Sequence, residues 1–98
     1  RDVYYISDLV NGYIKCLETP RIEGELFNFG SGVETSVNKV VELIIKLTNS
    51  QSKIIHINDT KLNAMNHMSL VIHKAKVLLD WKPTISLEEG LKLTIGEL

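Results

Sequence analysis

The most constraining feature of this sequence is a short glycine turn, residues 30–32, which separates an apolar run from a helical pattern. Residues 24–29 are rich in aromatic and aliphatic side chains, as is typical of a strand. In residues 37–45 the apolar side chains recur at helical spacing, and Ser36 stands where a helix N-cap is expected. Residues 53–57 form the next apolar, β-branched run. Strand, helix and strand with short connections predict a right-handed βαβ unit with two short parallel strands.

Three further helices are predicted around this unit. The first follows a Ser7-Asp8 cap signal and ends before Pro20. Another occupies residues 72–79, and the last begins with a capping box formed by Ser86 and Glu89. A chain of 98 residues is long enough for one small domain. We therefore expect a single α/β lobe, residues 1–98, with about four helices.

Composition excludes several classes of protein. The net charge is −1 with scattered basic residues, which argues against nucleic-acid binding. No apolar run approaches the roughly 18 residues of a membrane-spanning helix. The single cysteine, Cys16, has no partner for an internal disulfide and lies in an apolar helical pattern, so we interpret it as a small hydrophobic residue. We expect a cytoplasmic protein.

The glycine turn matches part of the dinucleotide-binding fingerprint G-x-G-x-x-G. Gly30 and Gly32 fit its first two positions, but Thr35 occupies the third, where a glycine normally lets helix and strand pack closely. Asp59 lies near, but beyond, the end of the second predicted strand. Two interpretations remain open on spacing alone: a cofactor loop, or a structural turn before a Ser-capped helix.

No catalytic pair for hydride transfer is recognisable. Such enzymes use a tyrosine with a lysine four residues later, which lowers the tyrosine pKa. The tyrosines are followed at that spacing by acidic or apolar residues: Tyr4 by Asp8, Tyr5 by Leu9 and Tyr13 by Leu17. We therefore predict no catalytic and no cofactor-binding residue in this chain. The spacing of His56, His67 and His73 does not suit a metal site either.

Three segments, in order, resemble one family of enzymes. They are RDVYYISDLVNGYIKCLETP, GELFNFGSGVETSVNKVVELI and HKAKVLLDWKPTISLEEGLKLTI. Together they are similar to the C-terminal substrate-binding lobe of extended short-chain dehydrogenases, which include NAD-dependent nucleotide-sugar epimerases, 4,6-dehydratases and decarboxylases. The resemblance implies that NAD and the catalytic residues belong to an N-terminal Rossmann domain preceding this chain. It also makes residues 30–32 a structural turn.

The resemblance implies two substrate-binding residues. Arg1 aligns with an arginine that binds the substrate diphosphate, and Lys61 stands near the place of a second such arginine. The alternative for Arg1 is a disordered terminal residue, and the alternative for Lys61 is a solvated loop lysine. Asp8 is interpreted as a helix cap and Trp81 as a partly buried anchor between the last two helices. Val71 and Asp80 depart from the family pattern, which leaves the substrate open.

The resemblance implies a portion of an enzyme rather than a complete one. We expect this chain to bind a nucleotide-diphosphate sugar and to be inactive without the Rossmann domain of the same protein. The alternative is a free-standing, non-catalytic binding or assembly module. An isolated lobe would also expose the apolar surface that faces the Rossmann domain, which favours self-association.

Overall fold

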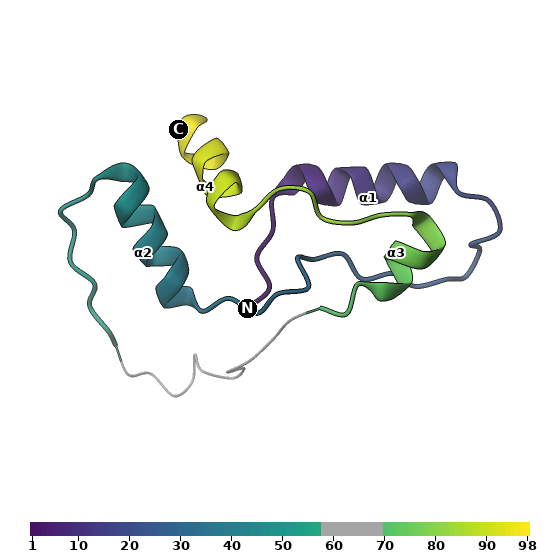
Figure 1. Cartoon of the computed structure of the whole chain (residues 1–98), viewed down its shortest axis with the longest axis horizontal. Helices are drawn as coiled ribbons and strands as arrows, with labels where there is room; N and C mark the ends of the chain where they lie inside the picture. Colours follow the sequence, from purple (N-terminus) through teal and green to yellow (C-terminus); the bar gives the residue numbers. More distant parts are fainter. Residues whose placement is uncertain (58–69) are drawn as a thin grey trace.

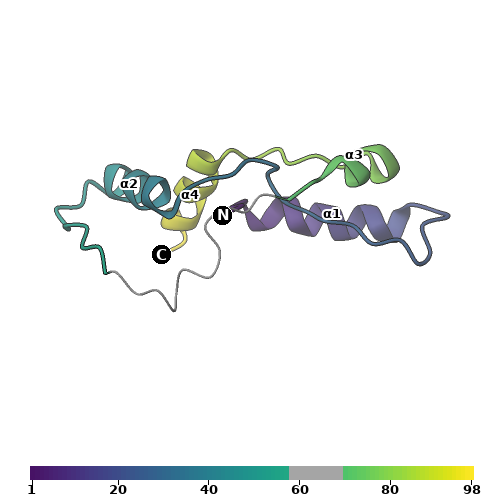
Figure 2. The same cartoon turned by 90° about the horizontal axis from the view of Figure 1, so that it is seen from below.

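A computed structural model describes residues 1–57 and 70–98 and contains four helices (Figure 1). They are α1 (Ile6–Glu18), α2 (Val37–Thr48), α3 (His73–Leu79) and α4 (Leu87–Gly96). Helix α1 packs on α3, and α2 packs on α4. The molecule is flat, measuring 51 × 33 × 17 Å, and Figure 2 shows this thin dimension. A layer this thin buries few side chains.

The core lies between α1, α3 and the extended segment that precedes the glycine turn. Its buried hydrophobic residues are Ile72, Ala75, Leu79 and Trp81. Partly buried side chains complete it: Cys16, Ile22, Phe27, Phe29 and Leu70. Cys16 is a free cysteine that packs against this cluster, which confirms its interpretation as a small hydrophobic residue.

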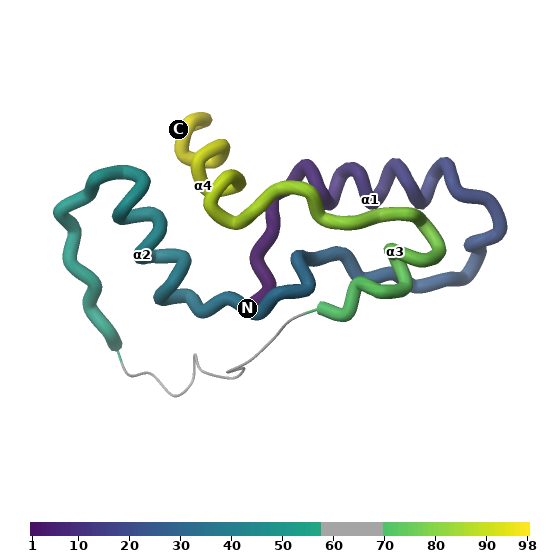
Figure 3. Tube along the Cα trace, in the orientation of Figure 1, coloured from purple at the N-terminus to yellow at the C-terminus, as the bar shows by residue number. Residues whose placement is uncertain are grey.

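The predicted βαβ unit is not confirmed, because residues 1–57 and 70–98 contain no β-strand. The two segments expected to pair lie apart: residues 24–29 run beside α3, and residues 53–57 lie beyond α2 (Figure 3). Ile55 and Ile57 are more than four-fifths exposed. An apolar run becomes a strand only when a neighbouring backbone supplies its hydrogen bonds, and these two segments do not supply them to each other.

The predicted caps of two helices are confirmed. The Ser36 hydroxyl accepts a hydrogen bond from the Lys39 amide at 3.1 Å, and the Ser86 hydroxyl accepts one from the Glu89 amide at 3.2 Å. The predicted cap of α1 is wrong. Its N-cap is Tyr5, which makes no side-chain cap bond, and Asp8 lies inside the first turn.

The end of α3 is closed by a residue in left-handed conformation. Asp80 has φ 53°, and the Trp81 amide donates to the Ala75 carbonyl at 3.2 Å, so the first residue after the left-handed position bonds back to α3. Asp80 thus occupies a position whose backbone favours glycine.

Asp80→Gly is expected to stabilise the chain by about 0.5–1 kcal/mol, because glycine adopts this backbone without a Cβ penalty. Asp80→Ala is the matched control and should be destabilising, since alanine carries the Cβ without aspartate's local hydrogen bonding. Urea unfolding measures both. Equal changes in the free energy of unfolding for the two variants would contradict the left-handed backbone conformation of Asp80.

Candidate functional site

The glycine turn wraps around the carboxylate of Asp2. Ser31 donates to Oδ1 from its amide and from its hydroxyl, both at 2.7 Å. The amides of Gly32 and Leu70 donate to Oδ2 at 3.1 and 2.9 Å. The amides of Ser31 and Gly32, which could have cradled a phosphate, therefore bind an anion of the chain itself. Their hydrogen bonds confirm the interpretation as a structural turn.

The carboxylate of Asp2 is held in its ionised form. Burial raises its pKa, but the hydrogen bonds from Leu70, Ser31 and Gly32 outweigh burial and leave the pKa below its ordinary value. A depressed pKa contributes stability above the unfolded-state pKa, and this stability is lost as the pH falls through the folded-state value. The turn is therefore weakened only in acid.

Arg1 is fixed beside this turn by its main chain. Its nitrogen donates to the Thr35 carbonyl at 3.0 Å, and its carbonyl accepts from the Thr35 amide at 2.7 Å. Thr35 directly precedes Ser36, the cap of α2. The backbone of Arg1 is thus tied to the start of a helix while Arg1 itself is exposed. Lys61, the second predicted binding residue, lies outside the described residues, as do Asp59 and His67.

Thr35 also lines an open groove of about 400 Å³. One wall comes from Val3 and the glycine-turn segment, and the other from the connection between α3 and α4. The lining residues are Val3, Ser31, Val33, Thr35, Pro83, Thr84, Ile85, Ser86 and Leu87. Segments from both ends of the chain therefore meet here.

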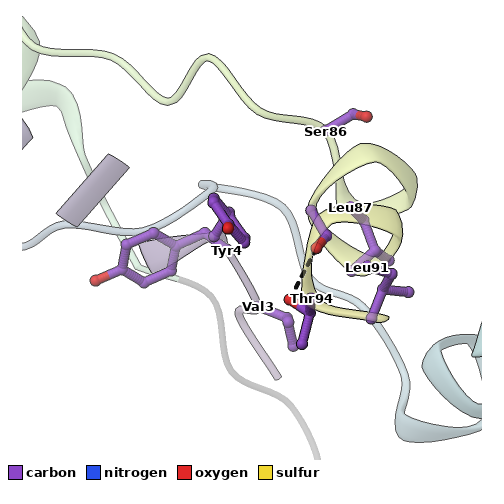
Figure 4. A pocket seen from close by; sticks show the side chains of 8 residues that line it. Val3, Tyr4, Ser86, Leu87, Leu91 and Thr94 are labelled. Carbon is purple, nitrogen blue, oxygen red and sulfur yellow. Dashed lines mark hydrogen bonds between the residues drawn. The ribbon is translucent and has the colours of Figure 1, made fainter. Parts of the chain in front are cut away.

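A smaller hollow of about 70 Å³ lies next to the groove and shares Val3, Ser86 and Leu87 with it (Figure 4). Its wall is mostly apolar and includes Tyr4, Tyr5 and Leu91. Burial, followed by repulsion from Tyr13, Asp2 and Asp8, raises the pKa of Tyr4. A phenol with a raised pKa stays protonated at neutral pH, so Tyr4 is unsuited to act as a general base.

Asp8 is the residue whose role the sequence interpretation missed. Its carboxylate is 1% exposed and accepts hydrogen bonds from the Thr84 amide and hydroxyl and from the Ile85 amide, at 2.9 to 3.1 Å. Its carbonyl accepts from Trp81 Nε1 at 2.9 Å. Asp8 therefore holds one wall of the groove against α1. These partners of the Asp8 carboxylate and carbonyl are at least 73 positions away, so no local pattern could indicate them.

The anchoring role of Trp81 is confirmed, with one correction to its surroundings. Its side chain is 2% exposed, and its ring lies edge-on to Phe29 with centroids 4.9 Å apart. Trp81 thus joins α1 to the segment before the glycine turn. The predicted position between the last two helices is wrong.

The described ranges, 1–57 and 70–98, hold no group of three or more His, Cys, Asp or Glu side chains arranged to bind a metal ion. Within the same ranges, no helix has the length and apolar character needed to cross a membrane.

Known enzymes that act on nucleotide sugars align with almost the whole chain, although no family model matches it. The UDP-glucuronate 4-epimerase of Thermodesulfobacterium geofontis is 36% identical over 98% of this chain and 29% of its own length. The solved UDP-glucose 4-epimerase of Thermotoga maritima, in complex with UDP-glucose, is 34% identical over 98% of this chain and 30% of its own, with a TM-score of 0.87. Other relatives are named as decarboxylases and 4,6-dehydratases.

These likenesses confirm the predicted resemblance to NAD-dependent nucleotide-sugar epimerases and dehydratases. The chain spans about 30% of the length of the curated relatives it matches. A further solved relative, the UDP-glucuronic acid 4-epimerase of Bacillus cereus in complex with NAD, is 28% identical over 94% of this chain and 28% of its own, with a TM-score of 0.74. NAD is thus bound by a longer relative.

Proposed function

We propose that this chain is the substrate-binding portion of an NAD-dependent nucleotide-sugar epimerase or dehydratase, and that Arg1 binds the substrate diphosphate. The observation that carries the proposal is the position of Arg1, whose backbone is paired with Thr35 on the wall of the large groove. A guanidinium group binds phosphate oxygens through two parallel hydrogen bonds. A fixed backbone lowers the entropy lost when such a side chain binds.

Lys61 is the proposed second cation of this site. It would add charge without the planar fork of an arginine, so its contribution to phosphate binding is smaller and less directional. The resemblance in sequence supports this assignment.

The chemistry is proposed to reside in a Rossmann domain that binds NAD. The support is the length of the relatives together with the absence of the Tyr-x-x-x-Lys spacing from this sequence. In this proposal the chain anchors the nucleotide so that the sugar meets the cofactor, which uses remote binding energy to orient the reacting group. Alone, the chain is inactive.

One face of α1 is proposed as the surface that the Rossmann domain covers. The apolar side chains that recur along this helix are largely exposed: Ile6 60%, Val10 47%, Tyr13 59%, Ile14 44% and Leu17 87%. An apolar stripe of this kind marks an interface rather than a solvated helix face. In the isolated chain, where no Rossmann domain covers it, this stripe would bind a second copy of the chain.

Arg1→Ala is expected to weaken UDP binding by the 98-residue chain about tenfold, because a charge-assisted pair is lost. The wild-type dissociation constant should itself be weaker than about 10 μM, since one lobe makes only part of the contacts. An NMR titration with UDP measures both values.

Arg21→Ala is the matched control, because it removes an exposed arginine remote from the groove. Its affinity for UDP should equal that of the wild type. An equal loss of UDP affinity in the two variants would show that the effect comes from net charge alone. Unchanged UDP affinity in Arg1→Ala would show that Arg1 does not bind the diphosphate.

A further inference from the structure

We propose that Asp2 is a positioning residue for nucleotide binding, which acts by holding Arg1 at the groove. The inference rests on the proposed phosphate role of Arg1. Asp2 follows Arg1 directly, and its carboxylate joins the glycine turn to Leu70. Arg1 is therefore fixed on two sides, by its own main-chain pair with Thr35 and by the anchored side chain of the next residue.

The hydrogen bonds of Asp2 leave it no direct role with a ligand. Each carboxylate oxygen already accepts two hydrogen bonds from the chain: Oδ1 from Ser31, and Oδ2 from Gly32 and Leu70. A carboxylate would also repel a phosphate if it faced one, whereas amide donors around it offset its charge. Any effect of Asp2 on phosphate binding must then pass through Arg1.

The turn is shaped around this carboxylate. A Cβ atom built on Gly30 would lie 2.9 Å from Asp2 Oδ2 and 3.0 Å from Leu70 Cδ1. Gly32 has φ 74°, a backbone conformation that suits glycine and directs its amide to Asp2. Gly30 and Gly32, which match part of a dinucleotide-binding fingerprint, therefore accommodate the carboxylate of Asp2. Asp2 directly follows Arg1, the proposed phosphate-binding residue.

The test is a double-mutant cycle between Asp2 and Arg1, read out as UDP affinity by NMR titration of the 98-residue chain. Asp2→Asn keeps the shape of the side chain but turns one acceptor into a donor that faces backbone amides. We expect it to weaken UDP binding about tenfold, which corresponds to about 1.4 kcal/mol. In an Arg1→Ala background the same change should alter affinity less than about twofold, because the two residues act in series.

Two further variants make the cycle decisive. Ser31→Ala removes one hydroxyl donor to Asp2 and should weaken UDP binding about threefold even if Asp2→Asn folds poorly. Because Ser31 also lines the groove, the positioning role further requires that this loss disappears in the Arg1→Ala background. Glu88→Gln removes an exposed carboxylate elsewhere and should leave affinity unchanged.

The outcomes separate the two proposals. If Arg1→Ala weakens binding while Asp2→Asn and Ser31→Ala do not, the positioning role is wrong and the phosphate role stands. If Asp2→Asn weakens binding equally in both backgrounds, Asp2 acts independently of Arg1 and the inference also fails. If Arg1→Ala has no effect, the proposed function itself is overturned.

Discussion

Asp8→Ala is expected to destabilise the chain by about 3 kcal/mol, the largest effect of any single substitution considered. The carboxylate is buried and accepts hydrogen bonds from Thr84 and Ile85, whose amides would be left without their acceptor. Removing the charge also removes the cost of burying it. The loss of stability is therefore smaller than the summed free energies of the hydrogen bonds that Asp8 accepts. The connection between α3 and α4 should detach from α1.

Urea unfolding followed by fluorescence measures this loss directly, because the only tryptophan, Trp81, donates to the Asp8 carbonyl. Asp8→Asn should lose about 2 kcal/mol, since one of its side-chain positions still accepts. Asn11→Ala, an exposed change on the same helix, should change stability by less than about 0.5 kcal/mol. If Asp8→Ala behaved like Asn11→Ala, Asp8 would not hold this connection.

Gly12→Ala is expected to destabilise the chain by about 2 kcal/mol, although alanine is normally favoured over glycine inside a helix by about 1 kcal/mol. A Cβ atom at Gly12 would lie 2.8 to 2.9 Å from three ring atoms of Phe29. The ring is held between Tyr13 and Trp81 and cannot move aside without disturbing the core. Overpacking therefore reverses the sign expected from helix propensity.

Gly96→Ala is the matched control, because Gly96 also lies in a helix but its Cβ would meet no atom within 4 Å. It should be neutral or stabilising by up to about 1 kcal/mol. Phe29→Leu introduced into Gly12→Ala should recover part of the lost stability, and a double-mutant cycle quantifies that coupling. Stabilisation by Gly12→Ala alone would disprove the close contact.

The helices were largely predictable from the sequence, and the predicted strands were not confirmed. Helical periodicity and the serine caps depend on residues within about four positions, so a local pattern carries the full signal. A strand depends on a partner backbone, and the segments at 24–29 and 53–57 do not provide one for each other.

The candidate site was predicted through resemblance and only partly through chemistry. Arg1 and Lys61 were implied by the family pattern, and the structure adds the backbone pairing of Arg1 with Thr35. Helical spacing identified the apolar stripe of α1, but spacing alone could not say whether that stripe lies in a core or on a surface.

The sequence by itself determined where α2 and α4 begin, that residues 30–32 turn, and that the chain resembles nucleotide-sugar enzymes. Only the tertiary structure decided what the turn binds and what Asp8 holds. Asp2 meets Ser31 across 29 positions, and Asp8 meets Ile85 across 77. A carboxylate has the same local signature whether it caps a helix, binds a ligand or anchors a distant loop, because its role is set by the donors that folding brings to it.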